Sequence, residues 1–147
     1  MDMIENWSSP DEAEREILGM LERKEKIMGF GHAIYRESDP RNEIIKEWSR
    51  QLADHVGDTT LYPVSVRCEE VMWREKKLFC NADFFHASAY HYMNIPTALF
   101  TPIFVMSRIT GWAAHIFEQR ANNRIIRPGA DYTGPEPRSY RPIGERG

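Results

Sequence analysis

The chain has 147 residues, 41% of them hydrophobic and 28% charged, which is long enough to bury one hydrophobic core. A nucleic-acid-binding face needs a strong excess of lysine and arginine, so the net charge of only −3 argues against a nucleic-acid partner. The two cysteines, Cys68 and Cys80, are too far apart for a Cys-x-x-Cys motif, and no basic and apolar secretory signal stands at the start. We therefore expect an intracellular, cytoplasmic protein with reduced thiols.

The first predicted helix follows Ser9. Ser9 is expected to cap it, Pro10 to occupy its first position and Glu12 to complete a capping box. Gly29 is expected to end it, because glycine accepts the left-handed conformation found at many helix ends. The apolar residues of its buried face are Ala13, Ile17, Met20 and Leu21.

Two further helices are predicted between residues 39 and 77. The earlier one has Asp39 as its cap and Pro40 inside it, and ends at Gly57. Its expected buried stripe repeats every four residues, as Ile44, Trp48, Leu52 and Val56. The later one covers about residues 61–77, and its apolar positions are Leu61, Val64, Cys68, Val71 and Met72.

The second half of the chain predicts two more helices and then an arm. One helix covers about residues 84–93, and a long one runs from Thr101 to about Ala121. Arg108 and His115 interrupt the apolar stretch 97–117, so we expect a buried helix there and no membrane partner. From residue 122, proline and glycine are too frequent for a regular element. No strand pattern is found, and the predicted fold class is all-α.

His32 stands directly after a Gly-Phe-Gly turn between two predicted helices. The glycines would let the backbone approach a bound molecule, although many such turns only join helices. Arg36 and Arg41 follow, and Arg41 lies at a helix start, where a cation is unfavourable. An anionic ligand would explain that position, because guanidinium binds carboxylate or phosphate with two hydrogen bonds. The alternative is a surface ion pair with Glu37 or Asp39.

Two other charged residues have both a structural and a functional interpretation. Arg108 lies in a helix expected to be buried, so it requires an anionic partner, either a carboxylate such as Glu118 or a substrate. Asp83 precedes a predicted helix, where it would serve as a cap or, beside aromatic walls, as a general base.

Metal and serine-nucleophile chemistry have little support in the sequence. His86 and His91 are five residues apart on one predicted helix, and so point to different sides. No Gly-x-Ser-x-Gly motif occurs. We expect no metal site.

Four ordered motifs carry a family resemblance: GFGHAIYRESDPR, NADFFHAS, SRITGWAAHIFEQ and RIIRP. Together they resemble the C-terminal part of the citrate synthase family, most of all its bacterial 2-methylcitrate synthases, over about residues 27–128. The resemblance implies His32 and Asp83 as catalytic residues. It also implies that the oxaloacetate carboxylates are bound by Arg41, Arg108 and Arg127, and coenzyme A by Gly29, Phe30 and Gly31.

The reaction implied is condensation of propionyl-CoA with oxaloacetate and water to 2-methylcitrate and CoA, or the same reaction of acetyl-CoA. The thioester is a substrate, and no cofactor is expected. The resemblance further implies a homodimer in which Arg127 reaches the neighbouring subunit's site. Residues 1–94 would be small-domain helices, 95–121 a buried helix returning to the large domain, and 122–147 a C-terminal arm.

One departure from the family pattern affects function. The family's other catalytic histidine belongs to a His-Gly-x-x-Asn-Glu motif, and none of the five histidines here is followed by glycine. We therefore expect a fragment with little activity alone and with exposed apolar surface on residues 102–121. The alternative is a non-catalytic helical module that binds an acyl-CoA or dimerises.

Overall fold

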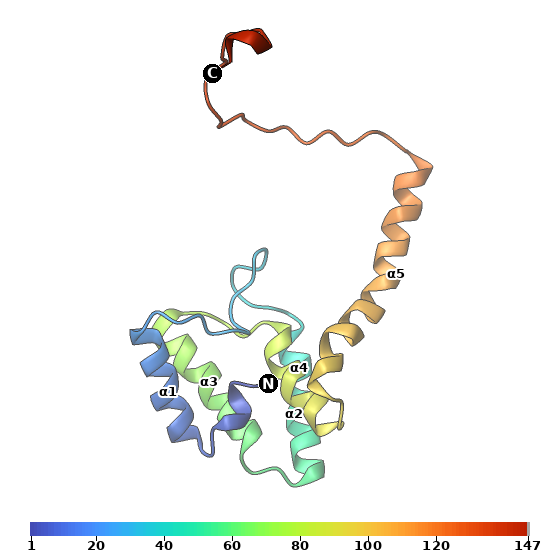
Figure 1. Ribbon diagram of the computed structural model, residues 1–147. Helices are drawn as coiled ribbons and strands as arrows, with labels where there is room; N and C mark the ends of the chain where they lie inside the picture. Colours follow the sequence, from blue (N-terminus) through green and yellow to red (C-terminus); the bar gives the residue numbers. More distant parts are fainter. Residues whose placement is uncertain (147) are drawn as a thin grey trace. The chain divides into compact units, whose positions relative to one another are not determined.

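The computed structural model describes residues 1–146, and its regular structure is helical (Figure 1). No strand occurs within these residues, and the one isolated bridge pairs Phe30 with Cys80, so the all-α prediction is confirmed. The α-helices are α1 (Pro10–Glu22), α2 (Asn42–Val56), α3 (Leu61–Lys76), α4 (Ala82–Tyr92) and α5 (Phe100–Ala121). The short 3-10 helices are η1 (Ile4–Asn6), η2 (Thr97–Leu99) and η3 (Ile143–Glu145).

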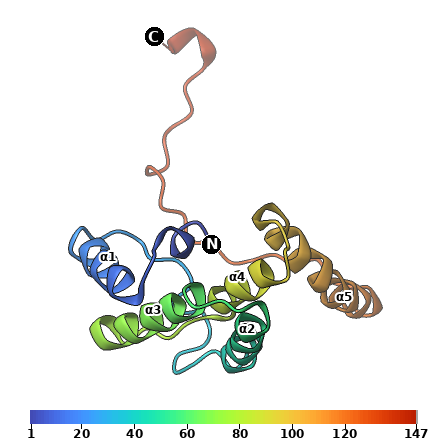
Figure 2. The same ribbon diagram turned by 90° about the horizontal axis from the view of Figure 1, so that it is seen from below.

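The chain forms two compact units, Met1–Ile109 and Thr110–Gly147. In the first unit α1 packs against α3 and α2 packs against α4, as Figure 2 shows from below. The second unit, described to residue 146, holds the end of α5, an extended segment and η3. The division into 1–94, 95–121 and 122–147 stays a prediction.

Helix α3 supplies much of the core. All five of its predicted apolar positions are buried, with Val64, Cys68 and Val71 inaccessible to solvent. Before the helix, the Asp58 carboxylate accepts hydrogen bonds from the backbone N–H groups of Thr60, Leu61 and Tyr62 at 3.0–3.3 Å. These bonds satisfy amides that have no partner inside the helix, which explains why α3 begins here.

Helix α1 begins as predicted and ends earlier. The Ser9 hydroxyl accepts from the N–H of Glu12 at 3.2 Å, while the Glu12 carboxylate accepts from the N–H of Ser8 at 2.8 Å. The prediction that Gly29 ends the helix is wrong, because α1 stops at Glu22. The run after Leu21 is charged and offers no apolar side chain to the core, and Lys24 turns the chain with φ of 57°.

Helix α2 buries only one residue of the predicted stripe, and that one partly. Leu52 packs partly buried against the core, whereas Trp48 is 57% exposed and Ile44 and Val56 are exposed as well. The buried positions are Asn42, Ser49 and Ala53. Small side chains let α2 approach α4 closely, and the hydroxyls of Ser49 and Ser88 meet at 2.7 Å between them. The close packing of α2 against α4 therefore decides which face of α2 is buried, although most of the larger apolar side chains lie on another face.

Helix α5 is mostly exposed to solvent. None of its residues is buried, and Phe117 is 71% exposed. The prediction of a buried helix is wrong for this chain, whereas the expected apolar exposure of residues 102–121 is confirmed. Within residues 1–146, no helix combines the length and apolar character that a membrane span needs.

Candidate functional site

The Gly-Phe-Gly turn is joined to the segment that precedes α4. Gly29 and Gly31 both have positive φ, 91° and 71°, a conformation that glycine adopts without strain. Gly31 N–H donates to Phe79 O at 2.8 Å, and Asn81 N–H donates to Gly29 O at 2.9 Å. The Asn81 side-chain amide donates to Gly31 O at 3.0 Å. The turn and the start of α4 thus form one hydrogen-bonded unit, with the Phe30 ring 4.8 Å from that of Phe84.

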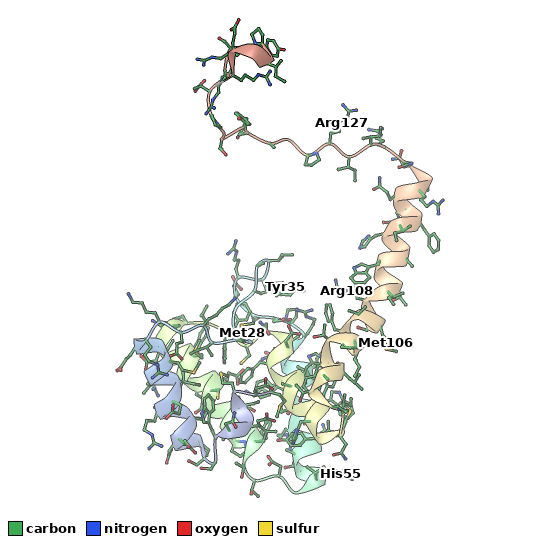
Figure 3. The ribbon with its side chains drawn as sticks, viewed as in Figure 1. Met28, Tyr35, His55, Met106, Arg108 and Arg127 are labelled. Atoms are coloured by element: carbon green, nitrogen blue, oxygen red, sulfur yellow. The ribbon has the colours of Figure 1, made fainter. Side chains whose placement is uncertain are left out.

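His32 leaves this turn with a defined ring orientation. Its Nδ1 accepts hydrogen bonds from the backbone N–H groups of Ile34 and Tyr35 at 3.0 and 3.2 Å, and its ring packs 4.7 Å from that of Tyr35. An accepting Nδ1 carries no proton, so the neutral imidazole holds its proton on Nε2. His32 therefore presents a hydrogen-bond donor at Nε2. Figure 3 shows Tyr35 in the protruding loop between α1 and α2.

Asp83 is the second residue of α4. Its predicted role as a cap is wrong, because the cap is Asn81, whose Oδ1 accepts from Asp83 N–H at 3.1 Å. This leaves the exposed Asp83 carboxylate available to two pockets that it lines, of about 320 and 230 Å³. Tyr90, Phe100 and Phe104 give the larger pocket aromatic walls.

Arg41 forms the N-cap of α2 and is bound by the carboxylate of Asp39. Its Nε and Nη2 donate to the two Asp39 oxygens at 2.9 and 2.7 Å, and its guanidinium lies 5.6 Å from the centre of the Tyr35 ring. These hydrogen bonds raise the pKa of Arg41, and the charge of Asp83 adds a smaller contribution. Of the two partners expected for a surface ion pair, Asp39 is the one present.

The other two arginines lie on different parts of the chain. Arg108 is exposed on α5, so the expected burial is wrong, and its guanidinium lies 5.1 Å from the centre of the Phe104 ring (Figure 3). Phe104 lines the pocket of Asp83. Glu118 was the carboxylate considered as a partner of Arg108, but its Oε2 lies 3.8 Å from Nδ1 of His115. Arg127 lies in the extended segment of the second unit and is exposed.

The structure thus joins the glycine turn to the start of α4, which carries Asp83, and it places both His32 and Arg41 beside Tyr35. Neither His32 nor Arg41 is among the residues that line the two pockets of Asp83.

Sequence reasoning did not identify two residues beside these candidate residues. Asp39 was expected only as a cap or ion-pair partner, and its aspartate-proline-arginine context gave no sign of a contact with α4. His86 lines the larger pocket with Asp83, one helical turn away, and this spacing could have revealed it. No cluster of three or more potential metal ligands occurs within residues 1–146.

Comparison with known proteins gives the family. Residues 1–129 match the citrate synthase C-terminal domain. A 2-methylcitrate synthase of Shewanella oneidensis is 66% identical over 146 residues, which is 99% of this chain and 39% of that protein. Citrate synthase 2 of Bacillus subtilis is 49% identical over 146 residues, with the same 99% and 39% coverage.

Solved structures agree with these sequence matches. The citrate synthase of Thermoplasma acidophilum, in a ternary complex with carboxymethyl coenzyme A and oxaloacetate, has a TM-score of 0.84 and 31% identity. The match covers 99% of this chain and 40% of that chain. The chain therefore spans about two fifths of the length of its relatives. It belongs to the citrate synthase family.

Proposed function

We propose that this chain is the C-terminal part of a 2-methylcitrate synthase, which condenses propionyl-CoA with oxaloacetate and water to give 2-methylcitrate and CoA. The 66% identity to the Shewanella oneidensis enzyme carries the choice of thioester. The observation that carries the chemistry is the hydrogen-bonded unit joining the glycine turn beside His32 to the start of α4 beside Asp83. No cofactor enters the proposal, because the thioester is itself a substrate.

Asp83 is assigned the first proton transfer. The α-carbon of a thioester is a very weak acid, so a positioned base must remove its proton as negative charge moves to the thioester oxygen. The Asp83 carboxylate is exposed to a pocket with aromatic walls and is not used as a helix cap. A general base at this position contributes about 10²–10⁴ in rate.

His32 is assigned to the keto group of oxaloacetate. Its Nε2–H donates to the carbonyl oxygen while the enol carbon of the thioester attacks the carbonyl carbon. The carbonyl oxygen becomes a hydroxyl by taking up a proton from solvent, and Asp83 releases the α-proton to solvent and returns to its carboxylate form, so that the step balances. Water then cleaves the thioester, so that CoA leaves as the thiol and a new carboxylate remains. The two backbone hydrogen bonds to Nδ1 support this role, because they set the donor at Nε2.

The arginines are assigned to the carboxylates of oxaloacetate. The Arg41 side chain is partly exposed, and Asp83 contributes to its electrostatic environment. Arg108 lies against the ring of Phe104, which lines the larger pocket of Asp83. Arg127 would act from the second subunit of a homodimer. Holding both carboxylates converts the encounter into an oriented one, which lowers the entropic part of the barrier. Gly29, Phe30 and Gly31 would contact coenzyme A.

The donor that stabilises the enol belongs to the part of the enzyme that this chain does not contain. The family's His-Gly-x-x-Asn-Glu histidine has no counterpart among the five histidines here. The apolar exposure of α5 supports the same view, because such a surface needs a covering partner. Activity is therefore proposed for the complete enzyme, with little or none for residues 1–147 alone.

A second candidate is citrate synthase with acetyl-CoA as the thioester. It is favoured by the 49% identity to citrate synthase 2 of Bacillus subtilis. The two reactions differ by one methyl group, and a methyl in an apolar pocket changes kcat/KM by about 10–200-fold.

A hybrid enzyme separates the two candidates. The matching 146-residue segment of the Shewanella oneidensis enzyme is replaced by this chain, and oxaloacetate-dependent CoA release is measured with each thioester. The proposal expects a higher kcat/KM for propionyl-CoA. A preference for acetyl-CoA would assign citrate synthase instead, and an inactive hybrid would contradict both candidates. The chain alone serves as the control expected to be inactive.

A further inference from the structure

Asp39 is a carboxylate whose side chain is completely inaccessible to solvent, 0% exposed. A charged group in such a position is tolerated only when partners replace the water it has lost. Three donors on Arg41 supply part of this replacement: its backbone N–H at 3.1 Å, Nε at 2.9 Å and Nη2 at 2.7 Å. A fourth donor comes from another helix, since the backbone N–H of Ala82 donates to Oδ2 at 2.9 Å.

The bidentate pair fixes the plane of the Arg41 guanidinium. Nε–H and one N–H of Nη2 are directed to Asp39, so the two N–H groups of Nη1 and the second N–H of Nη2 are left for an anion. The Arg41 side chain is 47% exposed, so a ligand can reach it from solvent. The ring of Tyr35, 5.6 Å from the guanidinium, supports its face.

The fourth hydrogen bond fixes the start of α4. Ala82 is the first residue of that helix, so its N–H has no partner inside the helix. Asp39 supplies the partner from 43 residues away, while Asn81 caps the N–H of Asp83. One carboxylate therefore holds both the guanidinium of Arg41 and the helix start that carries Asp83.

We propose that Asp39 is a positioning residue that orients Arg41 toward the substrate carboxylate and fixes Arg41 relative to Asp83. This inference rests on the proposed condensation, since it concerns the geometry of that site. Asp39 itself does not touch the substrate. Its loss should therefore weaken the binding of the keto-diacid selectively, through Arg41.

Kinetics of the hybrid enzyme test the proposal with three variants: Asp39→Asn, Arg41→Ala and the double variant. We expect Asp39→Asn to raise the KM for oxaloacetate about tenfold or more, and the KM for propionyl-CoA less than about twofold. The double variant should match Arg41→Ala, because both changes remove one interaction. Asp54→Asn is the control, since Asp54 is 68% exposed and pairs with Arg50 on the surface of α2.

A merely structural role predicts different results. Equal losses with both substrates, or effects that multiply in the double variant, would overturn the proposal. An inactive hybrid with the unaltered chain would instead refute the proposed function, so the two failures are distinguishable.

A measurement on the unaltered 147-residue chain needs neither folding of a variant nor activity. Hydrogen exchange of Arg41 Nε–H, paired with buried Asp39, is compared by NMR with that of Arg50 Nε–H, which donates at 3.0 Å to exposed Glu47. Arg41 is expected to exchange about tenfold more slowly, because its acceptor is shielded from water. Equal rates would show that Asp39 does not hold the guanidinium and would overturn the proposal.

Discussion

Gly29 packs its bare α-carbon against the ring of Phe84. A Cβ at position 29 would stand 2.7 Å from Cδ2 of that ring, closer than side chains approach one another. The backbone φ of 91° also disfavours any residue with a Cβ. The contact joins the glycine turn to α4, the helix that carries Asp83, so it sets the spacing of the candidate site.

Replacing Gly29 by alanine should therefore destabilise the chain more than an ordinary glycine substitution does. We expect a loss of about 2–4 kcal/mol in the free energy of unfolding, from backbone strain and displacement of the buried Phe84 ring. Gly57→Ala is the matched control, because Gly57 has φ of 73° and a Cβ added there would meet nothing within 4 Å. It should cost only about 1 kcal/mol. Urea unfolding of both variants measures the difference, and equal losses would refute the steric account.

The hydroxyl pair of Ser49 and Ser88, between α2 and α4, predicts that the two alanine substitutions destabilise the chain to different extents. Ser88 also lies 3.2 Å from Phe85 O, to which its hydroxyl donates, so Ser49→Ala leaves Ser88 with a partner. Ser88→Ala removes the hydroxyl that Ser49 contacts at 2.7 Å. We expect a loss of about 1–3 kcal/mol for Ser88→Ala and about half of that for Ser49→Ala. Thermal unfolding checks the order, and a reversed order would contradict this hydrogen-bond assignment.

The buried carboxylate of Asp39 should make a pH-dependent contribution to the free energy of unfolding. Hydrogen bonds from Arg41 hold the pKa of Asp39 well below its usual value of about 4. This stabilisation is fully present above the unfolded-state pKa and is lost as pH falls through the lower folded-state pKa. Asp39→Asn should therefore cost about 2–4 kcal/mol at neutral pH, and the cost should shrink below about pH 4.

Urea unfolding at neutral and acidic pH measures this cost. The other carboxylates are common to both proteins and cancel in the difference. Asp54→Asn, on an exposed ion pair, should cost less than about 1 kcal/mol at either pH. A cost for Asp39→Asn that is the same at both pH values would contradict the account.

The two cysteines should be unreactive in the folded chain. Burial raises the pKa of the Cys68 thiol to about 12, and burial also raises the pKa of Cys80. The thiolate is the reactive form, so little of it exists at neutral pH. A disulfide reagent should modify both thiols only after unfolding in guanidinium. Rapid labelling of the folded chain would show that the core around α3 opens readily.

The sequence predicted most helices, and the family resemblance supplied the residues of the candidate site, which stay predictions. Helix α3 followed directly from its apolar spacing, because five aligned side chains have one buried face available. The prediction of the buried face of α2 was wrong. The periodicity argument ranks side chains by hydrophobicity and does not consider that serine and alanine let two helices pack closely. The prediction that α5 is buried was also wrong. Its apolar composition indicates that the helix needs a partner surface, but composition does not show whether this chain contains that surface.

Among the candidate site residues, the family resemblance indicated His32, Arg41 and Asp83 but not what holds them. The contact of Asp39 with Ala82 joins positions 43 residues apart. Only the folded chain brings these positions together. Asn81 replaced Asp83 as the cap because either residue type caps well, and the helix started earlier than the apolar pattern suggested.

The central claim is that Asp83 removes the α-proton of the thioester. Its most direct test is oxaloacetate-dependent CoA release by the hybrid enzyme carrying Asp83→Asn, with Asp54→Asn as the matched exposed control. The account predicts that kcat falls by about 10²–10⁴ for Asp83→Asn, with the KM for oxaloacetate nearly unchanged. A kcat for Asp83→Asn equal to that of the control would contradict it.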